Sequence, residues 1–137
     1  MGTRADFYVG KGKKAEWLGS IAWDGYPEGV PDTIRKAKTK AEYIKAVDDF
    51  LQTREDATFP KDGWPWPWTD SCTTDYAYAF DKGQVWACPF GHGWFDATQK
   101  EPEDLPDNKT ASFPDMTAIQ KVSLGKNSGV MVLTVQR

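Results

Sequence analysis

Hydrophobic and polar positions alternate early in the chain and then change to a helical spacing. Residues 5–9 (ADFYV) and 15–23 (AEWLGSIAW) flank the glycine-containing turn GKGKK, a pattern that predicts a β-hairpin. Between residues 40 and 53, large apolar residues recur three or four positions apart, which predicts a helix with one buried stripe. Thr39 and Glu42 form a capping box that would begin this helix.

The second half of the chain shows the hairpin pattern twice more. Residues 75–80 (DYAYAF) and 84–88 (QVWAC) flank one short turn, and residues 118–124 (AIQKVSL) and 130–136 (VMVLTVQ) flank another. Three hairpins and one main helix predict an α+β fold, an antiparallel sheet built from hairpins with the helix packed on one face. The length favours a single domain, 1–137.

Charge and composition narrow the functional classes. The net charge is −3, and the proline-containing loop 96–115 is acidic, with six carboxylates and two lysines. A nucleic-acid-binding protein would show a basic stripe, so we expect no direct contact with nucleic acid. No apolar run approaches the length of a membrane span, and the N-terminus lacks the apolar core of a signal peptide, so we expect a cytoplasmic protein without membrane contact. The two cysteines are expected to be free thiols.

Tryptophan is unusually frequent, with seven residues, and three of them lie in the segment GWPWPW. Trp64 and Trp66 each precede a proline, which favours an extended backbone and places both rings with Trp68 on roughly one side. The three rings could cover the sheet as core. Alternatively, one or two could remain exposed as a stacking platform for a base, a sugar or a partner side chain. Because two prolines limit how far all three rings turn inward, we expect at least one ring, that of Trp66, to be over a third exposed and to border a cleft with Tyr26 or Arg4.

The two ends of the first predicted hairpin bring polar residues together. Arg4 precedes the first strand, and Asp24 and Tyr26 follow the second, so a guanidinium could lie beside a carboxylate and a phenol. One interpretation is a structural Arg–Asp clamp over the turn. The other is a pocket for an anion or a nucleotide, with Trp23 as its hydrophobic wall.

A weak candidate for catalysis is the pair Cys88 and His92, four residues apart in CPFGHGWF, with Asp75 and Asp96 as possible orienting carboxylates. A cysteine nucleophile needs a base within hydrogen-bonding reach and a third group that orients the base. The spacing matches no established signature, which favours a structural cysteine. One histidine and two cysteines do not complete a tetrahedral metal site, so no metal and no cofactor are expected.

Residues 1–90 carry several phrases that resemble small proteins encoded by bacteriophages and prophages. The shared features are an opening of the form M-x-T-R, here MGTRA, the phrase WDGYPEGV at 23–30, and GWPWPW followed by TTDYAYAF. The resemblance implies a phage origin. Phage accessory proteins of this size often act by binding, and anti-defence activity, including anti-CRISPR-like inhibition, is a recurrent use.

Three classes of function remain open on the sequence. The favoured one is a non-enzymatic, phage-type binding protein that occupies a host protein or a small nucleotide-like ligand. The second is a small enzyme that uses Cys88 and His92 or a carboxylate. The third is a structural or assembly component, in which the tryptophan ridge forms the interface of a homo-oligomer.

Overall fold

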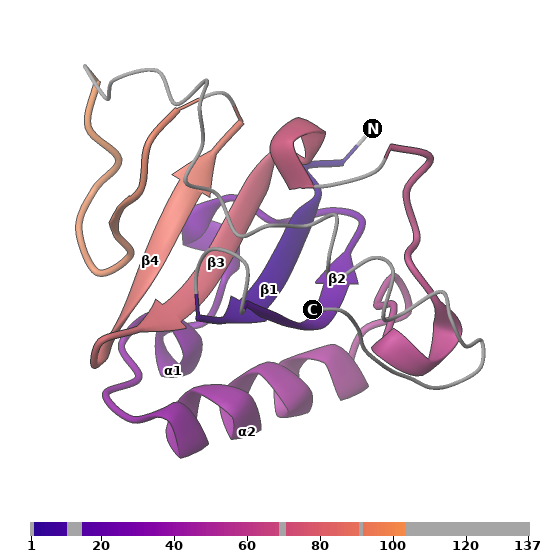
Figure 1. Ribbon diagram of the computed structural model, residues 1–137, viewed down its shortest axis with the longest axis horizontal. Helices are drawn as coiled ribbons and strands as arrows, with labels where there is room; N and C mark the ends of the chain where they lie inside the picture. Colours follow the sequence, from indigo (N-terminus) through magenta and orange to yellow (C-terminus); the bar gives the residue numbers. More distant parts are fainter. Residues whose placement is uncertain (1, 11–14, 69–70, 91, 104–137) are drawn as a thin grey trace.

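The structure, a computed structural model, describes residues 2–10, 15–68, 71–90 and 92–103 (Figure 1). These residues contain the strands β1 (Ala5–Val9), β2 (Glu16–Ile21), β3 (Tyr76–Asp81), β4 (Gln84–Pro89) and β5 (Phe95–Asp96). They also contain the helices α1 (Asp32–Arg35) and α2 (Lys40–Gln52), and the short 3-10 helices η2 (Pro27–Gly29), η3 (Pro60–Asp62) and η4 (Ser71–Thr73). The predicted third hairpin and most of the predicted acidic loop lie outside the described residues.

The strands form one sheet in the order β2-β1-β3-β4-β5. Both predicted hairpins within the described residues are confirmed, as β1–β2 and β3–β4. The α+β class is also confirmed, but the prediction of a purely antiparallel sheet is wrong, because β1 and β3 are parallel. Ala5 faces both Ile21, where β2 ends, and Tyr76, where β3 begins. The connection 22–75 therefore leaves and re-enters the sheet at the same end, which makes β3 run in the direction of β1.

Helix α2 forms where the capping pattern predicts it. The side chain of Thr39 accepts a hydrogen bond from the main-chain N–H of Glu42 at 3.1 Å, and the Glu42 carboxylate accepts one from the N–H of Lys38 at 3.0 Å. Its buried residues lie on one stripe and pack on one face of the sheet: Tyr43, Val47 and Leu51. Figure 1 shows α1 and α2 together on this face.

A β-bulge divides β2 between the two faces of the sheet. Phe7 of β1 pairs with Gly19, whereas the next residue, Tyr8, pairs with Trp17, so Leu18 is an extra residue in β2. The shift places the Trp17 side chain with Tyr8 in a second core cluster, on the face away from α2. Without this bulge, Trp17 would point toward the helices.

The connection from α2 to β3 passes round the β2 edge of the sheet and reaches the second face. Thr58 and Ser20 exchange two main-chain hydrogen bonds of 2.8 and 2.9 Å, which covers part of this edge strand. Gly19 is required at this crossing, because a Cβ there would lie 2.5 Å from the Leu51 side chain and 2.8 Å from the carbonyl oxygen of Thr58. Beyond the crossing, the Trp-Pro segment lies over the second face.

No helix among the described residues combines the length and the apolar character that crossing a lipid bilayer would require.

The helix face provides a direct test of the core. Substituting Val47, which is almost fully buried, with Asp would place an unpaired charge between α2 and the sheet. We expect this variant to lose cooperative thermal unfolding measured by circular dichroism. The neighbouring exposed substitution Asp48→Ala should change the free energy of unfolding by less than about 0.5 kcal/mol. A normal melting curve for Val47→Asp would contradict the packing of α2.

Candidate functional site

The Trp-Pro segment forms a layer over the second face of the sheet. Trp64 is 9% exposed and packs edge-on against Trp17, with ring centroids 5.1 Å apart. Trp66 and Trp68 are half-buried and stack on each other at 5.5 Å. The core interpretation therefore holds for Trp64, and the other two rings each combine packing with a partly accessible edge. None of the three projects freely from the surface.

Each indole N–H of this layer has a specific acceptor. Trp64 donates to the carbonyl oxygen of Trp68 at 2.8 Å, and Trp68 donates to the hydroxyl of Thr74 at 3.2 Å. Trp66 donates to the carboxylate of Asp6 at 2.8 Å. The rings are therefore fixed in orientation, which a purely hydrophobic covering would not require.

Asp6 lies at the centre of a buried polar cluster that the sequence interpretation missed. Its carboxylate also accepts hydrogen bonds from the hydroxyls of Ser20, at 2.5 Å, and Ser71. The Ser71 hydroxyl in turn contacts the phenol of Tyr8 at 2.6 Å. Burial raises the pKa of the Asp6 carboxyl, while its hydrogen-bond donors oppose the shift. The available signal was an acidic residue inside the otherwise apolar strand ADFYV.

Arg4 is bound by partners other than those the sequence suggested. Its Nε lies 3.3 Å from the carboxylate of Asp75, and its main-chain N–H donates to the same oxygen at 2.8 Å. The guanidinium also lies 4.8 Å from the ring centroid of Trp68 and 5.9 Å from that of Trp66. The expected proximity of Arg4 to Trp66 is present, but the clamp between Arg4 and Asp24 is not.

Asp24 instead belongs to a second clamp, centred on Arg54. The guanidinium donates to Asp56 at 2.7 and 3.0 Å, to the carbonyl oxygen of Trp23 at 3.0 Å, and to Asp24 at 3.4 Å. Asp56 also accepts the main-chain N–H groups of Ala22 and Trp23. Burial opposes ionisation of Asp56, but these hydrogen bonds lower its pKa, so the carboxylate stays charged and holds the loop.

Close packing and backbone conformation explain Asp24, Gly25 and Gly29 in the loop sequence WDGYPEGV. Asp24 adopts a positive φ of 66°, and a Cβ at Gly29 would lie 2.3 Å from the carbonyl oxygen of Asp24. A Cβ at Gly25 would lie 2.7 Å from the side chain of Ala5. The Tyr78 phenol donates to the carbonyl oxygen of Gly25 at 2.6 Å. The loop is therefore held at both glycines and at its first two residues.

This rigid loop presents aromatic side chains to solvent at one end of the sheet. Among the described residues, the exposed large hydrophobic side chains are Trp23, Tyr26 and Phe90, at 48%, 40% and 53%. Trp23 and Tyr26 follow the end of β2, and Phe90 follows the end of β4. The register places both strand ends at the end where β1 and β3 begin. We call the surface formed by these three residues the aromatic end. Arg4 and Asp75, which precede the two middle strands β1 and β3, lie between the loop after β2 on one side and Phe90 after β4 on the other.

Of the weak catalytic candidates Cys88 and His92, the thiol is closed off from solvent. Cys88 is fully buried in the face beneath the tryptophans, and its Sγ contacts the main-chain carbonyl oxygen of His92 at 2.9 Å. A buried thiol without solvent access cannot attack a substrate. The side chain of Cys72 lies outside the described residues. Within the described part of the chain, no group of three His, Cys, Asp or Glu residues could hold a metal ion.

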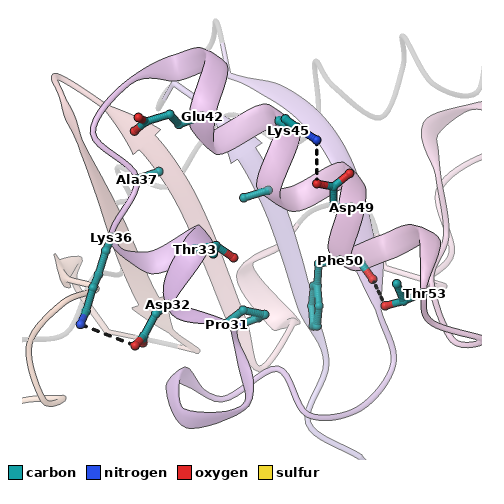
Figure 2. A pocket seen from close by; sticks show the side chains of 11 residues that line it. Pro31, Asp32, Thr33, Lys36, Ala37, Glu42, Lys45, Asp49, Phe50 and Thr53 are labelled. Carbon is teal, nitrogen blue, oxygen red and sulfur yellow. Dashed lines mark hydrogen bonds and ion pairs between the residues drawn. The ribbon is translucent and has the colours of Figure 1, made fainter.

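A groove of about 570 Å³ lies between α1 and α2 (Figure 2), and none of the predicted site residues lines it. Its rims carry Lys36 paired with Asp32 at 3.5 Å, and Lys45 paired with Asp49 at 3.0 Å. Because these charges are balanced within their own helices and are exposed to solvent, they offer little net attraction to a ligand. The aromatic end is therefore the stronger candidate for the functional site.

Comparison of the chain with protein-family models, with curated proteins and with solved structures finds no match in any of the three.

Trp64 and Trp23 provide a matched test of core against surface. Trp64→Ala removes a large buried ring and should lower the free energy of unfolding by about 3–5 kcal/mol. Trp23→Ala removes an exposed ring of the same type and should lower it by less than about 1 kcal/mol. Urea denaturation of both variants measures the difference. Equal losses would contradict the assignment of Trp23 to the surface.

The raised pKa of Asp6 predicts a specific pH dependence. Folding makes this carboxyl bind its proton more tightly, so its favourable contribution to stability is full below the unfolded pKa of about 3.9 and is lost as the pH rises through the folded pKa. Asp6→Asn removes the titration. We therefore expect the stability of the wild type relative to Asp6→Asn to fall as the pH rises from about 4.

Urea unfolding of the two proteins at several pH values measures this change. The readout is how the difference in free energy of unfolding between the two proteins changes with pH. Its absolute value is not informative, because the amide of the Asp6→Asn variant replaces one hydrogen-bond acceptor with a donor and thereby shifts the stability at every pH. A difference that is constant with pH, or one that grows with pH, would contradict the raised pKa.

Proposed function

We propose that this chain is a non-enzymatic, phage-type accessory binding protein that acts in the host cytoplasm by occupying a host protein through its aromatic end. The observation that carries this proposal is the exposure of Trp23, Tyr26 and Phe90 at one end of the sheet. Elsewhere in the described chain, large hydrophobic side chains are buried or half-buried. A local concentration of exposed aromatic rings is typical of a protein–protein interface.

Rigidity of the loop strengthens the proposal. Trp and Tyr are the residue types most enriched among those that dominate binding energy at interfaces. The Arg54–Asp56 clamp fixes the backbone of Trp23, and the packing of Gly25 and Gly29 fixes the rest of the loop. A preorganised loop loses little conformational entropy on binding, so more of the contact energy contributes to affinity.

The geometry favours a protein partner over a nucleotide-like ligand and over catalysis. Arg4, the residue suggested for an anion, already faces the Asp75 carboxylate and two tryptophan rings. Cys88, the suggested nucleophile, is buried and contacts a main-chain carbonyl oxygen. The charge of Arg4 is therefore already paired with a carboxylate, and catalysis by Cys88 would require its thiol to become accessible to solvent.

The resemblance to phage proteins supports the same surface. The shared phrase WDGYPEGV at 23–30 is the loop that presents Trp23 and Tyr26. Its two glycines and Asp24 are explained by packing and backbone conformation, whereas the rings of Trp23 and Tyr26 stay exposed, with only the Tyr26 hydroxyl donating to Asp24 at 3.4 Å among the described residues. We therefore propose that the rings serve the activity, and that this activity is inhibition of a host defence system.

A photo-crosslinking amino acid in place of Trp23 tests the surface. In host cells we expect one discrete cross-linked host protein from position 23, and none from Gln52, an exposed position on α2. Phe90→Ala should reduce the cross-link by about tenfold, as expected when one contributing aromatic side chain is removed. Lys61→Ala, a change at an exposed residue of η3, should leave the cross-link unchanged.

The same experiment separates the alternatives. A cross-linked product of two copies of this chain would replace the proposal with an assembly role. Equal cross-linking from positions 23 and 52, or none from either, would contradict a binding site at the aromatic end. In cells that restrict a phage, expression of the chain should raise the plaque count, and the double variant Trp23→Ala/Phe90→Ala should abolish the increase.

A further inference from the structure

Carboxylates outnumber cationic groups around the aromatic end. Five carboxylates belong to this region: Asp24, Glu28, Asp56, Asp75 and Glu101. Two guanidinium groups oppose them, Arg4 on Asp75 and Arg54 shared between Asp56 and Asp24. Among these described residues, five negative charges stand against two positive, a difference of −3.

Two of these carboxylates are not neutralised. Glu28 is an exposed residue of η2, two positions after Tyr26. Glu101 accepts a hydrogen bond from the Tyr76 phenol at 2.6 Å. Within the described parts of the chain, neither Glu28 nor Glu101 forms an ion pair. Burial raises the pKa of Tyr76 most, and the hydrogen bond to Glu101 and the charges of Glu101, Glu28 and Asp75 raise it further.

The outer faces of α1 and α2 carry paired charges instead. On the outer face of α2, Lys45 and Asp49 form a pair one helical turn apart, and Asp32 of α1 is shared by Lys36 and Arg35. Such pairs cancel most of the potential at a distance. The aromatic end therefore combines exposed ring faces with unbalanced carboxylates.

Both features attract the same kind of group. The faces of Trp, Tyr and Phe rings attract guanidinium and ammonium groups, and carboxylates bind guanidinium through two parallel hydrogen bonds. We infer that the partner of the aromatic end is a basic protein surface that places Arg or Lys side chains against Trp23, Tyr26 and Phe90 and beside Glu28 and Glu101. This inference rests on the proposed function and adds the chemistry of the partner, since charge complementarity selects partners and speeds their association.

A pair of short peptides tests the chemistry without the natural partner. The probes are the blocked peptides Arg-Leu-Arg and Glu-Leu-Glu, each titrated into the ¹⁵N-labelled full-length chain and followed by NMR. We expect Arg-Leu-Arg to shift the amide signals of Trp23, Tyr26 and Phe90, and Glu-Leu-Glu to leave them unchanged. The shifts should weaken as salt is added.

A charge-matched pair of variants tests the carboxylates. Glu28→Gln/Glu101→Gln removes two charges, retains side-chain size and keeps an acceptor for Tyr76. It should weaken Arg-Leu-Arg binding by about fivefold, the effect of two surface charges. The control, Glu16→Gln/Asp81→Asn, removes two charges at the opposite end of the sheet, where β2 begins and β3 ends, and should bind like the wild type.

Three results would overturn the inference: equal binding of both peptides, signal shifts spread over the opposite end of the sheet, or no response to Arg-Leu-Arg. The cross-link from position 23 distinguishes this failure from that of the proposed function. If the cross-link to a host protein persists while the peptide test fails, the aromatic end binds a partner that is not basic. If both fail, the aromatic end is not the binding surface.

Discussion

The carboxylate of Asp6 joins the sheet to the layer that covers its second face. Asp6 belongs to the central strand β1, and its hydrogen-bond partners come from β2, from η4 and from the Trp-Pro segment. Removing a carboxyl from water costs several kcal/mol unless hydrogen bonds replace its hydration. The four donors recorded around it, including Thr74, supply that replacement. Loss of any one segment would leave a buried polar group unsatisfied, so the cluster couples their positions.

The two faces of the sheet are therefore stabilised in different ways. The helix face is packed by apolar side chains of α2 and the strands, together with stacked rings such as Phe7 and Tyr78 at 5.4 Å. The tryptophan face adds directional hydrogen bonds to its packing, which fix where each ring lies. Trp64, Trp66 and Trp68 are buried or half-buried over the sheet, whereas Trp23, Tyr26 and Phe90 are exposed, which is why the proposed binding surface is the aromatic end.

The aromatic end depends on charge pairs that form between distant segments. Arg54, after α2, holds the loop that follows β2, and Asp75, before β3, holds Arg4 before β1. Each pair uses main-chain groups as well as side chains, so the loop is fixed in backbone conformation while Trp23 stays exposed. A rigid backbone with exposed rings is the combination that favours tight association, because the entropy is lost on folding and not on binding.

The sequence by itself determined the elements whose stabilising contacts are local. Helix α2 begins at its predicted cap, and both predicted hairpins within the described residues form, because side-chain period and turn residues act over a few positions. Only the tertiary structure decided the parallel pairing of β1 with β3, since the long connection 22–75 sets where the chain re-enters the sheet. It also decided the partners of Arg4 and Asp6, which lie 71 and 65 residues away at Asp75 and Ser71. Local patterns carry no information about contacts at that separation, because many carboxylates and hydroxyls are equally suitable until the sheet brings one pair together.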